Sequence, residues 1–250
     1  MIFRQLIETD SSTFTYLLAC PDTRQAILID PVLDTVKRDL EVLEELDLKL
    51  IYSLDTHLHA DHLTSARVLR ERTGCQVAFP EIEMPECADI GVKEGVPIRC
   101  GSVELKPLFT PGHTSHHHAY MLDDGTHRMV FTGDALLIDA CGRTDFQSGD
   151  SATLYQSIHD KLFSLPDETL VYPAHDYDGR FISSIAQEKT RNPRLGGGKT
   201  LEEFVAIMDG LDLPYPRKID FAVPGNALCG QCPENVPEQY RGPCDTHEQG

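Results

Sequence analysis

The sequence predicts an α/β (α+β) protein in which short strands alternate with helices along the chain. Two observations support this prediction. In the first quarter and again in the second half, apolar strand-like runs alternate with segments whose apolar residues repeat every three or four positions. Several strand-like runs also end in histidine or aspartate, so these strand ends are the candidate functional sites.

The first quarter contains predicted strands at residues 13–19, 26–30 and 49–54. The last of these, KLIYSL, has the apolar and aromatic mix of a buried strand. Asp34 is expected to cap a helix between the second and third strands. A second helix, which follows the third strand, is predicted to end at Gly74.

The remaining predicted strands are residues 75–79, 103–109, 119–122, 128–132 and 169–175. Asp150 or Ser151 is expected to cap a helix before the last strand, and another helix is expected near 181–190. Three glycines at 196–198 then form a natural hinge. One clear helix is expected after them, opened by a capping box of Thr200 and Glu203.

Composition narrows the function class. With 250 residues and 40% hydrophobic content, the chain can bury a sizeable core. A formal net charge of -18 argues against nucleic acid and against an anionic membrane surface, because both favour basic patches. The chain has no apolar run near the ~20 residues of a spanning helix, and its start resembles neither a signal nor a transit peptide. We therefore expect a cytoplasmic protein.

The eight cysteines are mostly scattered, which favours reduced thiols over a disulfide framework. The tail is an exception, because Cys229, Cys232, Cys244 and His247 have the spacing C-x2-C-x11-C-x2-H of a small zinc site. The alternative is a mobile tail whose thiols are incidental. We favour this alternative, because the long gap is irregular and rich in proline and glutamate.

The segment DTHLHADH (55–62) places His57, His59, Asp61 and His62 directly behind a strand. The i, i+2 spacing of the first two histidines allows a turn to direct both imidazoles at one ion, whereas a helix would present ligands at i, i+4. A solvated polar loop is the alternative. Three histidines and an aspartate behind an apolar strand fit that alternative poorly, so the segment predicts a metal-binding loop.

Three further strand ends carry ligand-type residues. His113 follows a strand in TPGHT, Asp134 follows one in VFTGD, and His175 ends TLVYPAH, with Asp176 and Tyr177 behind it. Pro-Gly and Gly-Asp are also ordinary turn dipeptides, which is the alternative explanation for the first two. Their shared position at strand ends favours a common metal site.

The segments THLHADH, TPGH, FTGD and YPAH, in this order, resemble the metallo-β-lactamase fold, an αββα sandwich of two mixed β-sheets flanked by helices. Within that superfamily, the chain is similar to persulfide dioxygenases, also called sulfur dioxygenases. This similarity rests on CGRTDFQ (141–147), YPAHDY (172–177), NPRL (192–195) and IDFAVPGN (219–226). We expect a catalytic domain at residues 1–195 and an extension at 196–250 that packs on the same domain.

The ligand inventory alone favours hydrolysis, because it would complete a two-metal site that activates a hydroxide. A hydroxyacylglutathione hydrolase of the glyoxalase II kind is therefore the alternative function. It is opposed by CGRTDFQ and by the short C-terminal region, since that enzyme carries a larger helical domain. A non-catalytic binding protein is a third alternative, and the complete ligand set argues against it.

The resemblance implies a different site, in which His57, His113 and Asp134 bind one Fe(II) per chain. Such a triad leaves open positions on ferrous iron, as activation of O2 requires. The implied reaction oxidises glutathione persulfide with O2 and water to glutathione and sulfite, in sulfide detoxification. The residues expected to orient the ligands and hold water are His59, Asp61, His62, His175 and Asp176.

For the substrate, Arg143 is the leading candidate to pair with a glutathione carboxylate, because its planar fork suits that geometry. Tyr177 could donate a hydrogen bond to the same tripeptide. The alternative for Arg143 is a salt bridge to Asp145. The expected partners are thus glutathione persulfide and O2, with no nucleic acid and no membrane, and a homodimer stays an open alternative.

One segment departs from the family pattern. After TPGHT the family usually continues with Pro-Gly, whereas here Ser115 leads into His116, His117 and His118. A second metal site is one interpretation. We favour the other, a partly solvated histidine run in a strand, which changes only the shape of that loop.

Overall fold

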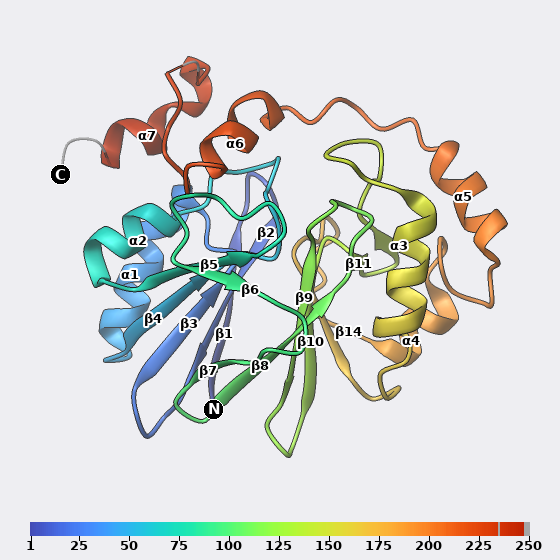
Figure 1. Cartoon of the computed structure of the whole chain (residues 1–250), viewed down its shortest axis with the longest axis horizontal. Helices are drawn as coiled ribbons and strands as arrows, with labels where there is room; N and C mark the ends of the chain where they lie inside the picture. The colour runs from blue at the N-terminus through green and yellow to red at the C-terminus, as the bar shows by residue number, and fades with distance from the viewer. Residues whose placement is uncertain (235, 248–250) are drawn as a thin grey trace.

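The computed structural model describes residues 1–234 and 236–247, and for residues 246 and 247 it describes the backbone alone. Two six-stranded sheets face each other and helices cover their outer faces, so the layers follow the order αββα (Figure 1). This is the sandwich of two mixed sheets that the sequence predicted. A short β-ribbon, β11-β12, lies beside the second sheet.

The strands of the first sheet are β1 (Ile2–Glu8), β2 (Thr13–Ala19), β3 (Gln25–Ile29), β4 (Lys49–Leu54), β5 (Gln76–Pro80) and β6 (Ile90–Val92). Those of the second sheet and the ribbon are β7 (Ile98–Cys100), β8 (Val103–Phe109), β9 (His118–Asp123), β10 (Arg128–Gly133), β11 (Leu136–Leu137), β12 (Ala140–Cys141), β13 (Leu170–Pro173) and β14 (Ser183–Ser184). The helices are α1 (Val36–Glu45), α2 (Ala66–Thr73), α3 (Ser151–Ser157), α4 (Ile185–Arg191), α5 (Leu201–Asp209), α6 (Ile219–Asn226) and α7 (Gly242–His247). Short turns of other helix types are η1 (Leu33–Thr35), η2 (Ile158–Leu162) and η3 (Glu238–Tyr240).

The first sheet has the order β1-β2-β3-β4-β5-β6, antiparallel from β1 to β3 and parallel from β3 to β6. Helices α1 and α2 pack on its outer face, where they bury Val36, Leu43 and Leu69. Phe221 of α6 and Cys244 of α7 belong to the same hydrophobic cluster. Helix α2 ends at Gly74, whose φ of 72° lies in the left-handed region that glycine adopts without strain.

The second sheet has the order β14-β13-β10-β9-β8-β7. Strands β8, β10 and β13 run parallel to one another, and β9 runs opposite to them, so the carboxyl ends of three strands and the start of β9 share one edge. Helices α3, α4 and α5 lie on the outer face (Figure 1). The predicted apolar stripe of α3 continues through η2, and Leu154, Ile158 and Leu162 are all fully buried.

The core between the two sheets is built largely from aromatic side chains. Tyr16, Tyr120 and Phe131 are almost completely buried there. The hydroxyl of Tyr16 donates to the carbonyl of Pro173, and that of Tyr120 donates to the carbonyl of Asp55 at 2.8 Å, so both polar tips are paired. These bonds join the two sheets near the strand ends that carry the site.

Most of the elements predicted from the sequence are confirmed. The capping box of Thr200 and Glu203 opens α5, and the Asp150 side chain caps α3 by accepting from the amide of Thr153. The prediction for α1 was wrong in one detail, because the cap position is Thr35 and Asp34 lies in η1. The expectation of one clear helix after the glycines was also wrong, since α6 and α7 follow α5.

The prediction of reduced cysteines was wrong for four of the eight. Cys87 is bonded to Cys229, and Cys232 to Cys244, so these residues cannot act as zinc ligands. The side chain of His247, the fourth member of the predicted zinc set, lies outside the described residues. The other four thiols are free and buried, namely Cys20, Cys75, Cys100 and Cys141.

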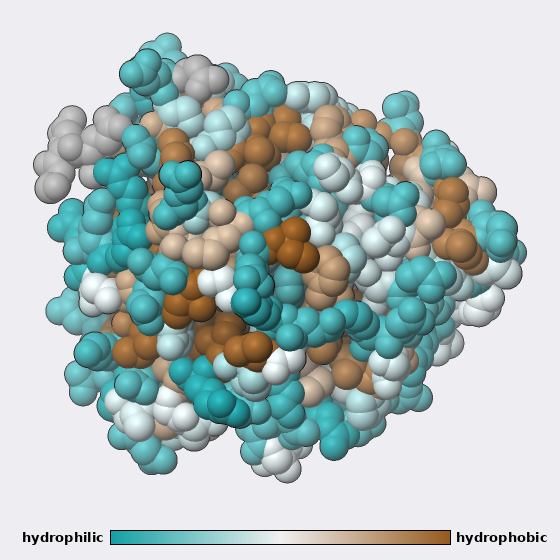
Figure 2. Space-filling model, in the orientation of Figure 1, coloured by the Kyte–Doolittle hydropathy of each residue, from teal (hydrophilic) through white to brown (hydrophobic). Residues whose placement is uncertain are grey.

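The surface is mixed rather than dominated by one kind of residue. Hydrophilic residues cover most of the face drawn in Figure 2, and hydrophobic residues form separate patches among them. Across the described part of the chain, no helix has the length and apolar character that spanning a bilayer requires.

Candidate metal centre

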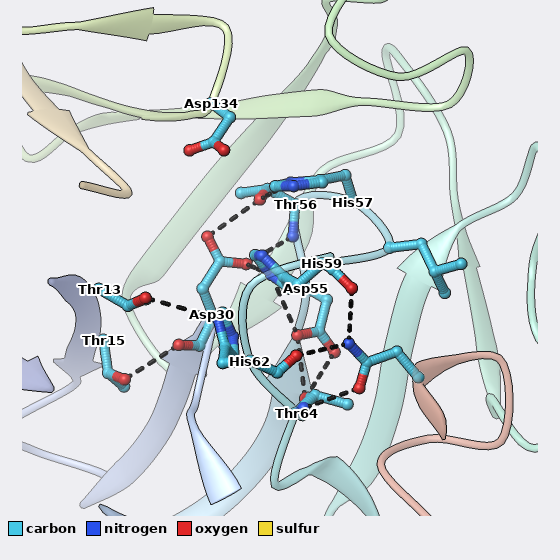
Figure 3. Close-up of polar contacts among 12 residues, drawn as sticks. Thr13, Thr15, Asp30, Asp55, Thr56, His57, His59, His62, Thr64 and Asp134 are labelled. Atoms are coloured by element: carbon cyan, nitrogen blue, oxygen red, sulfur yellow. Dashed lines mark hydrogen bonds and ion pairs between the residues drawn. The ribbon is translucent and has the colours of Figure 1, made fainter. Parts of the chain in front are cut away.

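The carboxyl ends of β4, β8, β10 and β13 converge on one site. His57 lies three residues after β4, His113 four residues after β8, Asp134 directly after β10 and His175 two residues after β13. The first of these side chains comes from one sheet and the other three come from the facing sheet. The site therefore lies across the end of the sandwich, as Figure 3 shows for His57 and Asp134.

His57, His113 and Asp134 each offer a ligand atom, and these three atoms lie within 4.8 Å of one another. Nε2 of His113 is 3.4 Å from Oδ2 of Asp134, and the rings of the two histidines are 4.9 Å apart and nearly perpendicular. Two imidazoles and one carboxylate at this spacing can face a common ion.

The orientation of His57 is set by a chain of hydrogen bonds from Asp30. The hydroxyl of Thr56 donates to Oδ2 of Asp30 at 3.0 Å, so it accepts from Nδ1–H of His57 at 2.9 Å (Figure 3). Since Nδ1 carries the hydrogen, Nε2 is the nitrogen left to bind a metal. Asp30 follows β3, which runs parallel to β4, so both residues lie at the same sheet edge.

The orientation of His113 is set by the backbone after β12. Nδ1–H of His113 donates to the carbonyl oxygen of Arg143 at 2.7 Å. Gly142 precedes this carbonyl, and a Cβ added there would lie 2.1 Å from the backbone oxygen of Asp134 and 2.8 Å from Nδ1 of His113. Only glycine fits, because two ligand-bearing loops meet at this position.

His59, Asp61 and His62 form a second group of potential ligands beside the first. Nε2 of His175 lies 3.6 Å from Oδ2 of Asp61 and 3.4 Å from Oδ1 of Asp134, so His175 stands between the two groups. His59 and His57 therefore belong to different groups of potential ligands, although their rings are only 4.2 Å apart. The i, i+2 spacing predicted that the imidazoles of His57 and His59 face one ion, and it gave no sign that the two residues would belong to different groups.

Burial and neighbouring charges give the two groups different electrostatics. Burial, together with the surrounding histidines, holds the pKa of His57 well below its usual value, so its imidazole is neutral, the form that binds metals. Burial, the largest single influence, lowers the pKa of His59, but the carboxylates of Asp30, Asp55 and Asp61 together raise this pKa to about 9, with Asp30 at 3.1 Å. His59 is therefore charged and paired with Asp30 in this structure.

Several buried atoms at the site have no hydrogen-bond partner, namely Oδ1 of Asp134, Nδ1 of His59 and Nε2 of His62. A buried polar atom without a partner costs about 1–3 kcal/mol, so its presence calls for a ligand. The donor set of nitrogen and carboxylate oxygen suits a transition metal. The residues present therefore fit a metal centre.

A pocket of about 690 Å³ opens over the centre. His57, His113, Asp134 and His175 line it together with five cationic side chains, namely Arg143, Arg180, Arg194, Arg217 and Lys218. Phe146, Tyr177, Tyr215 and Tyr240 add aromatic surface. Six aspartates line the same pocket, and Arg180 and Lys218 form ion pairs with four of them, so the pocket offers cationic groups without a net excess of positive charge.

The predicted substrate residues lie in this pocket. Arg143 makes the bidentate salt bridge to Asp145 that the sequence analysis gave as the alternative, with both contacts under 2.8 Å. Its third nitrogen donates to the carbonyl of Pro214. Tyr177 is 74% exposed and its ring stacks on that of His175.

Asp176 is placed differently from the sequence-based expectation. Its carboxylate accepts hydrogen bonds from the side chain of Arg180 and from the amides of Asp178 and Arg180. These contacts direct it to the pocket wall, so the expectation that it orients a metal ligand stays a prediction.

Sequence reasoning missed Asn226 of α6. Its amide donates to the carbonyls of His59 and His62, and its oxygen accepts from the amide of Thr64, at 2.8–2.9 Å. These bonds fix the histidine loop from a helix more than 160 residues away in sequence. No local pattern indicates such a contact, whereas Asp30 could have been found as an acid at the end of a neighbouring parallel strand.

The expectation for the histidine run was wrong. His116, His117 and His118 are at most 2% exposed, so the run is not solvated. It enters β9 at the edge where the ligands lie, because β9 runs opposite to β8 and β10.

Comparison with known proteins agrees with this geometry. A family model described as the metallo-beta-lactamase superfamily matches residues 9–175. The mitochondrial persulfide dioxygenase ETHE1 of Homo sapiens is 48% identical over 231 residues, 92% of this chain and 89% of that protein. A crystal structure of ETHE1 from Myxococcus xanthus superposes with a TM-score of 0.88 at 53% identity, and the match covers 92% of this chain and 100% of that one.

A probable hydroxyacylglutathione hydrolase of Schizosaccharomyces pombe is more distant, with 32% identity over 206 residues, 77% of this chain and 76% of that protein. The superfamily match, the identity to persulfide dioxygenases over nearly the whole chain and the shared fold all agree. The chain belongs to the metallo-β-lactamase superfamily and, within it, to the persulfide dioxygenases.

Proposed function

We propose that the protein is an iron-dependent persulfide dioxygenase that converts glutathione persulfide, O2 and water to glutathione and sulfite. In this reaction the terminal sulfur gives up four electrons to O2, and the bond between the two sulfurs breaks. The thiol keeps one sulfur, and the other leaves as sulfite with three oxygens, two from O2 and one from water. The proposed role is the removal of sulfide-derived sulfur.

The observation that carries the proposal is the cluster of His57, His113 and Asp134 at the base of a pocket lined in part by arginines, in a chain with 48% identity to a persulfide dioxygenase. These three residues would hold one Fe(II) per chain, which supplies open positions for O2 and a sulfur ligand. The hydrogen bonds that His57 and His113 donate to the Thr56 hydroxyl and the Arg143 carbonyl leave the Nε2 atom of each histidine to bind the metal.

The remaining residues have supporting roles in this proposal. His59, Asp61, His62 and His175 orient the ligands and hold water, and Asp176 positions Arg180 at the wall of the pocket. Arg143 and Tyr177 bind the glutathione part, whose carboxylates suit a guanidinium fork. To bind the substrate in this way, the Arg143 guanidinium breaks its salt bridge to Asp145 and pairs with a glutathione carboxylate instead.

One observation favours the second candidate, a two-metal hydroxyacylglutathione hydrolase. His59, Asp61, His62 and His175 are all present, and two of their buried nitrogens have no partner. This set could hold a second ion. The lower identity to the probable hydrolase, 32% against 48%, places this function second.

The test is metal analysis combined with turnover. We expect about one iron per chain after anaerobic purification, and uptake of O2 that depends on glutathione persulfide and yields sulfite. Alanine at His57, His113 or Asp134 should remove both iron and activity, because a triad has no spare ligand. Two tightly bound zinc ions with rapid hydrolysis of S-lactoylglutathione would contradict the proposal.

Three finer properties complete the proposal. Residues 1–195 form the catalytic domain, and 196–250 form an extension that supports it, as the contacts of Asn226 suggest. The protein is a homodimer of 27.9 kDa chains, which light scattering tests. The proposed location is the cytoplasm, where glutathione is kept reduced, and the two disulfides of this chain are unusual for that compartment. The mammalian relatives are named as mitochondrial, and fractionation of cells that express the chain decides between the two locations.

A further inference from the structure

The buried histidine run at the start of β9 contacts every loop that carries a ligand of the proposed triad. The amide of Leu58, the residue after His57, donates to Nε2 of His116 at 2.9 Å. The amide of Asp134 donates to Nε2 of His117 at 3.1 Å. Two consecutive side chains thus accept backbone hydrogens from the segments that follow β4 and β10, which belong to different sheets.

The third ligand loop is reached through Thr110, which opens TPGH. Nδ1 of His117 lies 2.8 Å from the hydroxyl of Thr110, and the amide of Thr110 donates to the carbonyl of His117 at 2.9 Å. His117 is fully buried, and both ring nitrogens are engaged. Since Nε2 accepts an amide hydrogen, the ring must carry its own hydrogen on Nδ1, which donates it to Thr110.

The turn that presents Asp134 is shaped around this ring. Gly133 has a φ of 50°, and a Cβ added there would lie 2.4 Å from Nε2 of His117. The left-handed backbone and the missing side chain allow the amide of Asp134 to reach the imidazole. The ring thus holds the backbone from which the Asp134 carboxylate projects, and His117 is not among the residues that line the pocket.

We propose that His117, assisted by His116, is a positioning residue that braces the loops of His57, His113 and Asp134 in the geometry that binds the metal. This inference rests on the proposed triad and goes beyond it, because it assigns a role to residues outside the ligand set. A buried imidazole that only filled space would need no hydrogen bonds to these loops, whereas the two rings accept from the His57 and Asp134 loops and His117 donates to Thr110 of the His113 loop. Loss of a group that orients a ligand typically weakens metal affinity about 10–100-fold.

The test compares two substitutions at one position. His117→Phe keeps a buried ring and removes both nitrogens, whereas His117→Gln retains an acceptor near the position of Nε2. Co(II) replaces iron as the probe, and its dissociation constant and its d–d absorption are measured for each variant. His118→Phe is the matched control, because the His118 side chain bonds only the carbonyl of His116 within the run itself.

We expect His117→Phe to bind Co(II) about 10–100-fold more weakly with an altered spectrum, and His117→Gln to stay within roughly threefold of the wild type. His118→Phe should bind like the wild type. The proposal is overturned if His117→Phe binds normally, if Gln gives no rescue, or if the His118 control weakens binding equally. If His117→Phe does not fold, Thr110→Val replaces it, and unchanged Co(II) affinity there also overturns the proposal.

Failure of the triad itself gives a different result. His57→Ala should abolish the d–d absorption of the wild-type complex. If the wild type binds no Co(II), or if His57→Ala binds it equally well, the proposed triad is wrong. The proposal that His117 positions the triad is then wrong as well. If Co(II) binding depends on His57 but not on His117, only the proposal for His117 is contradicted and the proposed triad stands.

Discussion

Nδ1–H of His113 donates to the backbone carbonyl of Arg143 at 2.7 Å, so the residue proposed to meet the substrate also orients a proposed metal ligand through its main chain. The bond depends on Gly142, which lets the two loops touch. Substitutions of the Arg143 side chain leave this carbonyl in place. A substitution of Gly142 therefore tests how the Arg143 main chain orients His113, without changing the Arg143 side chain that is proposed to bind the substrate.

Gly142→Ala should abolish iron binding, because the new Cβ would collide with the backbone oxygen of Asp134 at 2.1 Å and with the ring of His113. Iron content after anaerobic purification measures the effect. Gly210→Ala is the control, since a Cβ there would lie 3.3 and 3.5 Å from two carbonyl oxygens, a crowding that a shift of a few tenths of an ångström relieves. A Gly142→Ala protein that keeps a full complement of iron would show that the loops can move apart freely.

His175→Ala separates the one-metal from the two-metal site. If iron is held by the triad, the variant should keep its metal when iron is in excess, with turnover reduced roughly 10–100-fold. In a two-metal hydrolase the same change would empty a metal position. Iron content and O2 uptake are measured together, with His127→Ala, whose side chain is 57% exposed, as the control. Loss of half or all of the metal would return the hydrolase to first place.

Asn226→Ala should lower the free energy of unfolding by about 2–4 kcal/mol, because two carbonyls and one amide lose a buried partner. Chemical denaturation of the metal-free protein measures this loss without the contribution of iron. Lys37→Ala, at a side chain that is 87% exposed, should have almost no effect. A loss below about 1 kcal/mol for Asn226→Ala would mean that water replaces the amide.

Asp39 gives a pH-dependent prediction away from the site. Burial raises the pKa of Asp39 to about 6, although Arg38 opposes the shift. A raised folded-state pKa of an acid stabilises the protein at low pH, and this contribution is lost as the pH rises through about 6.

Asp39→Asn removes the ionisation, so its stability relative to the wild type should improve by about 1–2 kcal/mol between pH 4.5 and pH 7.5. Urea unfolding of both proteins at the two pH values measures the difference. The same difference at both values would place the pKa of Asp39 near that of an exposed acid.

Local sequence patterns were sufficient to predict the helices and strands whose limits depend on nearby side chains. Strand β8 and the capping box of α5 were predicted with correct limits, because both depend on residues a few positions apart. The ligand-type residues were found because each stands behind a strand. What could not be predicted depends on packing between distant segments, such as the bonds from Asn226 to the histidine loop.

The histidine run and the cysteines show the same limit. Whether His117 faces solvent or the core depends on the facing sheet, which no run of neighbouring residues reveals. The bond between Cys87 and Cys229 joins residues 142 positions apart, so their scattered positions carried no signal. The partners of Asn226, of His117 and of the Cys87–Cys229 pair are all distant in sequence.

His57 follows a strand of one sheet, whereas His113 and Asp134 follow strands of the other, and this placement has a thermodynamic consequence. An ion held by all three joins the two halves of the sandwich, so metal binding and resistance to unfolding are linked. A ligand that binds only the native state at 100 times its dissociation constant adds about 2.7 kcal/mol of stability. If the metal is the proposed iron, cells short of iron would contain less folded protein as well as less active enzyme, and the melting temperature would report the fraction of chains that carry metal.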